Sequence, residues 1–262
     1  MRERLGILTQ EDEHIGVCER CNKDIYKHRI VYQDGRIVEK EIGCECQARI
    51  DAIKDLERKR IAEYERYSVI NTDYKNKRVN AYKPQNETQR VAKVNVINFI
   101  TNHEAALEKG QGMILMGAFG TGKTHLASAI RNALVENDKR VLFISFPDYL
   151  DVIKQGFGKG GQVDQRYTQI SYKTQELAKK ADLLVLDDVG ANSMTDWAKE
   201  QLFLLINSRI GKSTVVTTNY RTQDFERDRE LHRSFSRMSE LSPIIEIEGE
   251  DLRRLKGAFN YG

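Results

Sequence analysis

Short segments rich in apolar residues alternate with longer segments of helical spacing along the chain after residue 110. The short segments are typical of strands buried on both faces, because they are too short for helices. Between them, apolar residues recur at helical spacing, as they do at Leu126, Ala129 and Ile130. The predicted strands cover 113–116, 140–145, 182–187, 213–219 and 243–247. This alternation predicts an α/β fold, a parallel sheet flanked by helices with ligands at the carboxyl ends of its strands.

A glycine-rich segment joins the first of these strands to a helix. Residues 117–124 fit G-x-x-x-x-G-K-[ST], the phosphate-binding loop. Its glycines let backbone N–H groups point at phosphate oxygens, and the following helix adds its positive N-terminal end. We expect Lys123 to reach the β- and γ-phosphates of ATP and Thr124 to bind Mg²⁺. The residues expected to bind the nucleotide and its metal are Gly117, Gly120, Thr121, Gly122, Lys123, Thr124, His125 and Asp187.

Two carboxylates end the strand that begins at residue 182. Asp187 is expected to hold the Mg²⁺ shell, and Asp188 to polarise the water that attacks ATP. A strand that ends in an ordinary acidic turn is the alternative, but the phosphate loop upstream favours the catalytic interpretation.

All four cysteines lie near the N-terminus, in a C-x-x-C pair and a C-x-C pair formed by Cys18, Cys21, Cys44 and Cys46. Between the pairs, segments 29–32 and 36–39 predict a hairpin around residues 33–35, which would bring the two pairs together. Four thiolates in a closed tetrahedral set suit a structural Zn²⁺, with free thiols as the alternative. So small a module has few apolar residues and depends on such a cross-link.

These patterns divide the chain into three parts. We expect a zinc module with four cysteine ligands over 1–46, a connecting helix and linker over 47–85, and an ATPase domain with a small lid segment over 86–262. The connecting helix is amphipathic, which suits either docking to a partner or packing on its own domain.

The composition places the chain among globular proteins, with 262 residues, 40% hydrophobic and 31% charged, and a net charge of +3. No apolar run approaches the length of a membrane-spanning helix, and the first four residues lead into no apolar export signal. We therefore expect a cytoplasmic protein without a membrane partner. A basic bias between residues 47 and 93 suits contact with nucleic acid or a solvated helix face.

The ordered combination of 117–127, 184–190, 217–219 and 236–238 resembles the AAA+ ATPases of the bacterial and phage helicase-loader group. These are the DnaC/DnaI-like proteins, with the transposition helper IstB as a close relative. The resemblance extends from about residue 71 to the C-terminus, and the cysteine module resembles the N-terminal zinc domain of DnaI-type loaders.

The resemblance implies further roles in catalysis. Asn219 matches the sensor-1 residue that orients the attacking water, and Arg237 matches a sensor-2 arginine that reaches the γ-phosphate. Arg209 lies where an arginine finger would act on the ATP of a neighbouring subunit, which implies self-association through the ATP interface. Asp188 replaces the glutamate usual in AAA+ proteins, so we expect slow, switch-like hydrolysis.

Loaders of this kind bind single-stranded DNA through an added helical element, for which 148–180 is the candidate. Basic and aromatic residues there suit contact with a DNA backbone and its bases. They are Lys154, Phe157, Lys159, Arg166, Tyr167 and Lys173, although Tyr167 lies on the apolar face and is expected in the core.

These features predict an ATP-dependent loader of the replicative helicase onto single-stranded DNA, with ATP, Mg²⁺ and Zn²⁺ as cofactors. An IstB-like transposition ATPase is one alternative, and a nucleotide-binding adaptor with negligible hydrolysis is another. A DnaA-type initiator is disfavoured, because about 25 residues follow Arg237 and such initiators carry a DNA-reading domain there.

Overall fold

A computed structural model describes residues 7–157, 164–191 and 194–251 of the chain. The chain divides into two compact units, Met1–Lys59 and Arg60–Gly262. Helix α1, Cys46–Tyr67, contributes residues to both of them.

The first unit contains an antiparallel sheet in the order β1-β2-β3, formed by Ile7–Val17, Asp24–Tyr32 and Ile37–Ile42. Strands β2 and β3 are the predicted hairpin, and their register runs from Tyr26 opposite Ile42 to Val31 opposite Ile37. Strand β1 was not predicted. Its residues are mostly exposed and polar, so no alternation of buried and exposed positions marks it as a strand.

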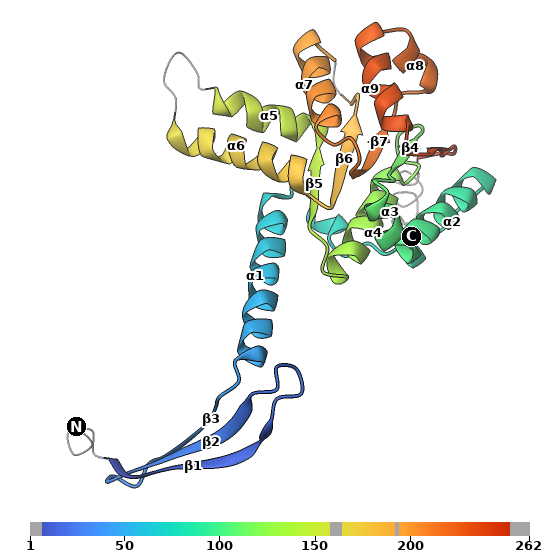
Figure 1. Ribbon diagram of the computed structural model, residues 1–262. Coiled ribbons are helices and arrows are strands. Elements are labelled where there is room, and N and C mark those ends of the chain that lie inside the picture. The colour runs from blue at the N-terminus through green and yellow to red at the C-terminus, as the bar shows by residue number, and fades with distance from the viewer. Residues whose placement is uncertain (1–6, 158–163, 192–193, 252–262) are drawn as a thin grey trace, which may run out of the picture. The chain divides into compact units, whose positions relative to one another are not determined.

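The second unit is built on a parallel sheet in the order β5-β6-β7-β4-β8 (Figure 1). Its strands are β4 Met113–Met116, β5 Val141–Ser145, β6 Leu183–Val189, β7 Ser213–Thr218 and β8 Ile244–Glu246. Each lies within one residue or two of a predicted strand, and together they confirm the predicted fold class. Continuous burial along β4 and β6 explains why their sequences read as unbroken apolar runs.

Helices cover both faces of this sheet. Met113 and Leu115 face a cluster with α2, Glu87–Thr101, α3, His103–Glu108, and α4, Lys123–Glu136. Ile114 and Met116 face the opposite cluster, because successive side chains of a strand point to opposite faces. Besides Tyr64 of α1, that second cluster has residues from α5 Phe146–Gly156, α6 Gln165–Lys180, α7 Asp196–Asn207, α8 Thr222–Glu226 and α9 Arg229–Ser239.

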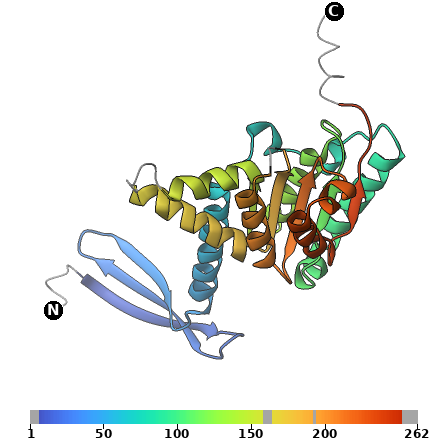
Figure 2. The same cartoon turned by 90° about the horizontal axis from the view of Figure 1, so that it is seen from above.

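Helices α5 and α6 lie side by side and extend past the β5 edge of the sheet (Figures 1 and 2). The Thr168 hydroxyl of α6 donates to the Gly156 carbonyl at the end of α5, 3.1 Å away. This helical pair is the segment over 148–180 expected to contact DNA.

The segment that follows α1 belongs to the second unit and is not a separate linker. Tyr64, near the end of α1, is only 4% exposed and lies in the core beside the sheet. The Val69 N–H donates to the Phe143 carbonyl at 2.8 Å, and the Phe143 N–H donates to the Ser68 hydroxyl at 3.0 Å. Residues 68 and 69 therefore satisfy hydrogen-bonding groups on the free edge of β5.

Candidate functional site

The carboxyl ends of β4, β7 and β6 bring the predicted nucleotide residues together. Lys123 follows β4, and its Nζ donates to Oδ1 of Asn219, which follows β7, at 2.7 Å. Thr124 Oγ1 donates to Oδ1 of Asp187, in β6, at 3.2 Å. Because these strands are neighbours in the sheet, residues far apart in sequence form one polar cluster.

The phosphate loop takes a conformation that requires glycine, as two of its positions show most clearly. Gly120 and Gly122 have φ angles of +76° and +95°, in the left-handed region. At Gly122 a Cβ atom would also lie 2.4 Å from the Tyr82 ring. The Tyr82 hydroxyl donates to the Thr121 carbonyl at 2.9 Å, so a buried tyrosine from residues 60–85 supports the loop from behind.

Lys123 lies inside the curve of the loop and is only 5% exposed. Its ammonium group donates to the carbonyl oxygens of Gly117, at 2.8 Å, and Ala118, at 2.7 Å, as well as to Asn219. His125, in the first turn of α4, donates from Nε2 to the Arg78 carbonyl and packs edge-on against Tyr82. The His125 ring thus contacts the segment before α2, and its contact with the nucleotide stays a prediction.

A β-bulge lies at the two carboxylates of β6. Pairing with β7 passes from Leu186 opposite Val216 to Val189 opposite Thr218, so β6 has one residue more than its partner. Asp188 adopts a φ of +56°, which is rare for a residue other than glycine. Bulges of this kind re-aim side chains and occur next to active sites, and this one changes the direction of two consecutive carboxylates.

Burial and the neighbouring Asp188 charge raise the pKa of Asp187 to about 6. Hydrogen bonds from the hydroxyls of Thr217 and Thr124, and the Lys123 charge, act in the opposite direction. A carboxylate that is 4% exposed and hydrogen-bonded mainly to neutral hydroxyls is unfavourable by itself. It is the environment that a bound divalent cation would stabilise.

Asn219 offers a further donor to the same site. Its Oδ1 accepts from Lys123, whereas its Nδ2 is buried and has no hydrogen-bond partner among the described residues. Buried polar groups are usually paired, so this donor fits a ligand oxygen such as that of a phosphate. Together with the glycine loop and the Asp187 carboxylate, it makes the residues present suitable for a nucleoside triphosphate with Mg²⁺.

The four cysteine sulfurs lie within 4.8 Å of one another. The Cys46 N–H donates to Sγ of Cys44 at 3.3 Å, a contact that favours the thiolate form that a metal binds. His14 and His28 instead contact Asp24 and Asp12 on the sheet. The donor set is therefore four sulfurs, which suits a tetrahedral Zn²⁺.

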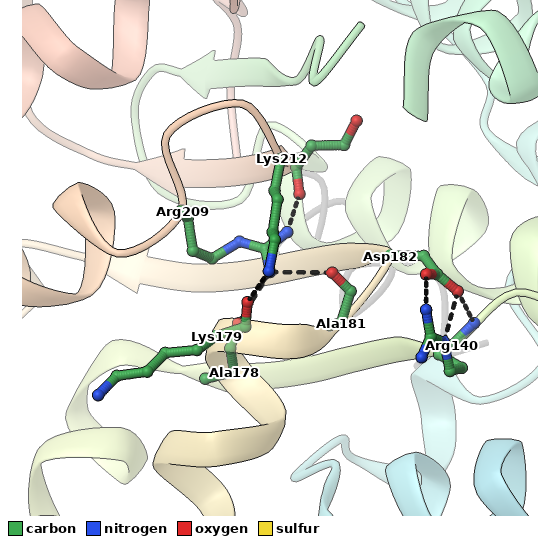
Figure 3. A network of polar contacts seen from close by, with 8 residues as sticks. Arg140, Ala178, Lys179, Ala181, Asp182, Arg209 and Lys212 are labelled. Atoms are coloured by element: carbon green, nitrogen blue, oxygen red, sulfur yellow. Dashed lines mark hydrogen bonds and ion pairs between the residues drawn. The ribbon is translucent and has the colours of Figure 1, made fainter. Parts of the chain in front are cut away.

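Arg209 does not lie at the surface where an arginine finger would act. It is 2% exposed, and Figure 3 shows its guanidinium among peptide carbonyls at the end of α6. Nη1 donates to the carbonyls of Ala178, at 2.9 Å, and Ala181, at 3.0 Å, while Nη2 donates to that of Ser213. Arg209 thus satisfies carbonyls that a helix end leaves unpaired and ties α6 to β7. Its position argues against the predicted role.

Arg237 also lies away from its own phosphate loop. It is exposed on α9, and its guanidinium stacks on the Phe203 ring, with 5.5 Å from Cζ to the ring centre. It borders a cavity of about 160 Å³ with Gly110, Lys212 and Thr214, which precede or begin β4 and β7. The phosphate loop follows the opposite end of β4, so Arg237 is not placed to contact a γ-phosphate bound within the same chain.

Tyr167 is 49% exposed, so the expectation that it lies in the core is wrong. Phe157, directly after α5, and Tyr172, on α6, are 69% and 72% exposed. Lys154 stacks on the Trp197 ring, while Lys173 pairs with Glu63 and Glu176. Lys159 lies outside the described residues.

Residues 54–257 match the family model described as IstB-like ATP binding protein. The chain belongs to this family. The match includes every residue of the nucleotide cluster, from Gly117 to Asn219. No helix in the described ranges is both long and apolar enough to cross a membrane.

Two kinds of protein, helicase loaders and insertion sequence ATP-binding proteins, resemble the chain over part of its length. The replicative helicase loader DnaI of Bacillus subtilis is 31% identical over 94 residues, which are 36% of this chain and 27% of that protein. A putative insertion sequence ATP-binding protein of Sinorhizobium fredii is 36% identical over 112 residues, or 43% of this chain and 35% of that protein. The chain thus spans about a third or less of the length of these relatives.

A crystal structure of the DnaC helicase loader aligns with a TM-score of 0.56 and 27% identity. The alignment covers 68% of this chain and 100% of that one. The similarity supports the AAA+ fold that the strand order already indicates.

We predict that replacing Arg209 destabilises the second unit itself. Arg209→Gln would remove a buried donor and leave several carbonyls unpaired, lowering the free energy of unfolding by about 3–5 kcal/mol. Arg233→Gln removes an arginine that stacks on Phe203 at the surface, and should change it by less than about 1 kcal/mol. Urea denaturation measures both. If Arg209 were an arginine finger without a structural role, Arg209→Gln would instead be as stable as the wild type.

We also predict that Asp187→Asn stabilises the protein in the absence of nucleotide and Mg²⁺. Because the pKa of Asp187 is raised to about 6, the folded state binds more protons than the unfolded state between about pH 4 and 6. Stability of the wild type is therefore lost as the pH rises through this range. Asparagine carries no such cost, so the variant should gain roughly 1–3 kcal/mol over the wild type at pH 7.5 and less at pH 4.

Asp182→Asn is the matched control for this measurement. Burial by itself would raise the pKa of Asp182, but hydrogen bonds from Arg140 outweigh it and lower the pKa. Its carboxylate therefore stabilises the folded state above that pKa, and Asp182→Asn should be less stable than the wild type at pH 7.5. A loss of stability in Asp187→Asn at pH 7.5, measured in EDTA, would contradict the burial argument.

Proposed function

We propose that this protein is an ATP-dependent loader that delivers the replicative helicase onto single-stranded DNA. The observation that carries the proposal is the polar cluster at the ends of β4, β6 and β7, in a family described as ATP-binding, together with the similarity to DnaI and DnaC. The cysteine cluster in a separate N-terminal unit adds a candidate helicase-binding module.

In this proposal the loop residues hold the triphosphate and the carboxylates hold its metal. Lys123 turns from the loop carbonyls toward the β- and γ-phosphates, while Thr124 and Asp187 hold Mg²⁺, which neutralises charge on the phosphates. Asn219 donates from Nδ2 to the γ-phosphate or the attacking water. Asp188 polarises that water, and its short side chain suits slow, switch-like hydrolysis.

The proposed DNA contact lies on the α5–α6 pair. Its exposed aromatic rings, Phe157, Tyr167 and Tyr172, offer stacking surfaces for bases. Arg166 is exposed on α6, the helix that carries the two tyrosines, and its charge suits contact with the phosphate backbone.

Self-association through the ATP interface remains part of the proposal, but Arg209 is not its arginine. Arg233 and Arg237 are exposed one turn apart on α9 and both stack on Phe203, which holds their guanidinium groups at the surface. We propose them as arginines that reach the nucleotide of a neighbouring copy, where a guanidinium would stabilise charge on the γ-phosphate.

A transposition helper of the IstB kind is the second candidate. The insertion sequence ATP-binding protein of Sinorhizobium fredii is as similar as the helicase loaders over the region compared. Both functions use the same nucleotide site, so the partner separates them.

The test combines ATP binding with partner capture by the full-length protein. Calorimetry should find ATP–Mg²⁺ binding in the wild type and in Lys109→Ala, an exposed lysine before β4, and none in Lys123→Ala. A pull-down should then capture the replicative helicase, and not an IS21-type transposase, in the presence of ATP. Capture of the transposase alone would replace the loader with the helper.

Zinc binding is tested on the same protein. We expect one Zn²⁺ per chain by atomic emission, and loss of both zinc and helicase capture in Cys21→Ser with Cys44→Ser. ATP affinity should persist, because the nucleotide cluster belongs to the other unit. His14→Ala, whose ring contacts Asp24, is the control that should retain zinc. A wild type purified without zinc, and stable to chelator, would refute the module.

A further inference from the structure

The bulge in β6 removes a backbone N–H from the sheet ladder. Where two residues of β6 face one of β7, the ladder of backbone hydrogen bonds is interrupted, and an N–H at the interruption needs another acceptor. It donates to the side-chain oxygen of Thr217, in β7, at 2.9 Å.

The same hydroxyl also contacts the carboxylate expected to bind Mg²⁺. Because Thr217 Oγ1 accepts from the Asp188 N–H, its own proton is available, and it donates to Oδ1 of Asp187 at 2.5 Å. Thr124 donates to this same oxygen at the longer distance of 3.2 Å. One hydroxyl group therefore fixes both the backbone of Asp188 and the carboxylate of Asp187.

The Thr217 and Asp187 side chains are shielded from water. Thr217 is 0% exposed, and the Asp187 side chain beside it is 4% exposed. Asp188 has a left-handed φ of +56°, which costs energy for this residue and persists only when neighbouring groups hold it. The Thr217 hydroxyl holds the Asp188 N–H, while the Ala191 N–H holds the Asp188 carbonyl from the following turn.

We infer that Thr217 is a positioning residue that sets the metal affinity of the nucleotide site by holding Asp187 and Asp188 in their bulged geometry. The inference rests on the proposed ATP–Mg²⁺ function and adds a residue to it. Partners that hold a ligating carboxylate typically change metal affinity by about 10–100-fold when they are removed. Lys123 and the glycine loop do not depend on Thr217, so nucleotide affinity without metal should be unaffected.

The experiment measures the affinity for a non-hydrolysable ATP analogue by calorimetry, first in EDTA and then across a Mg²⁺ series. Thr217→Val keeps the shape of threonine, and Thr217→Ala and Thr217→Ser differ from each other only by the hydroxyl. We expect the valine and alanine variants to need about 10–100-fold more Mg²⁺ for half of the metal-dependent gain in affinity. Thr217→Ser should need the wild-type concentration, and all variants should bind equally in EDTA.

Thr218→Val is the matched control. Thr218 is also 0% exposed, and its hydroxyl also makes two hydrogen bonds, to the Val189 carbonyl and from the Tyr220 N–H. It contacts neither carboxylate, so its loss should lower stability without changing the Mg²⁺ requirement. The inference is overturned if the valine and alanine variants match the wild type, or if Thr218→Val shifts the requirement equally. A wild type without nucleotide affinity would instead overturn the proposed function.

Discussion

The second unit depends on two buried charges at the carboxyl ends of its strands. Lys123 and Asp187 are 5% and 4% exposed, and a buried charge is costly unless hydrogen bonds and opposite charges surround it. Peptide carbonyls and Asn219 surround the ammonium group, while threonine hydroxyls surround the carboxylate. The hydroxyls offset the burial of the carboxylate only partly, and the raised pKa of Asp187 is the consequence. The arrangement is typical of a functional site, where residual instability is relieved by a ligand.

The parallel sheet makes this concentration of charge possible. Because all of its strands point the same way, the segments that follow β4, β6 and β7 emerge side by side although 63 and 96 residues separate their contacts. Helix α4 begins at the same place and contributes its N-terminal N–H groups. The bulge in β6 then changes the direction of the Asp187 and Asp188 side chains, which would point to opposite faces in a regular strand.

Arg209 shows how the same chemistry serves structure elsewhere in the unit. At the other end of the sheet its guanidinium gathers carbonyls from the end of α6 and the start of β7, and burial lowers its pKa to about 10, so it stays charged at neutral pH. A planar group with five donors suits such a cluster of acceptors. The signal for this role was present in the sequence: Arg209 continues the apolar stripe of Leu202 and Leu205, the face of α7 that is buried in the core.

The sequence by itself determined the parallel α/β fold, the phosphate loop and the clustering of the four cysteines, because each depends on local spacing. Apolar runs, glycines followed by Lys-Thr, and a hairpin turn carry their structural meaning within a few residues. Only the tertiary structure decided which arginines are buried, that Tyr82 supports the phosphate loop, and that Thr217 joins the two carboxylates. These facts depend on contacts between segments distant along the chain, and on a one-residue shift in register that no local pattern records.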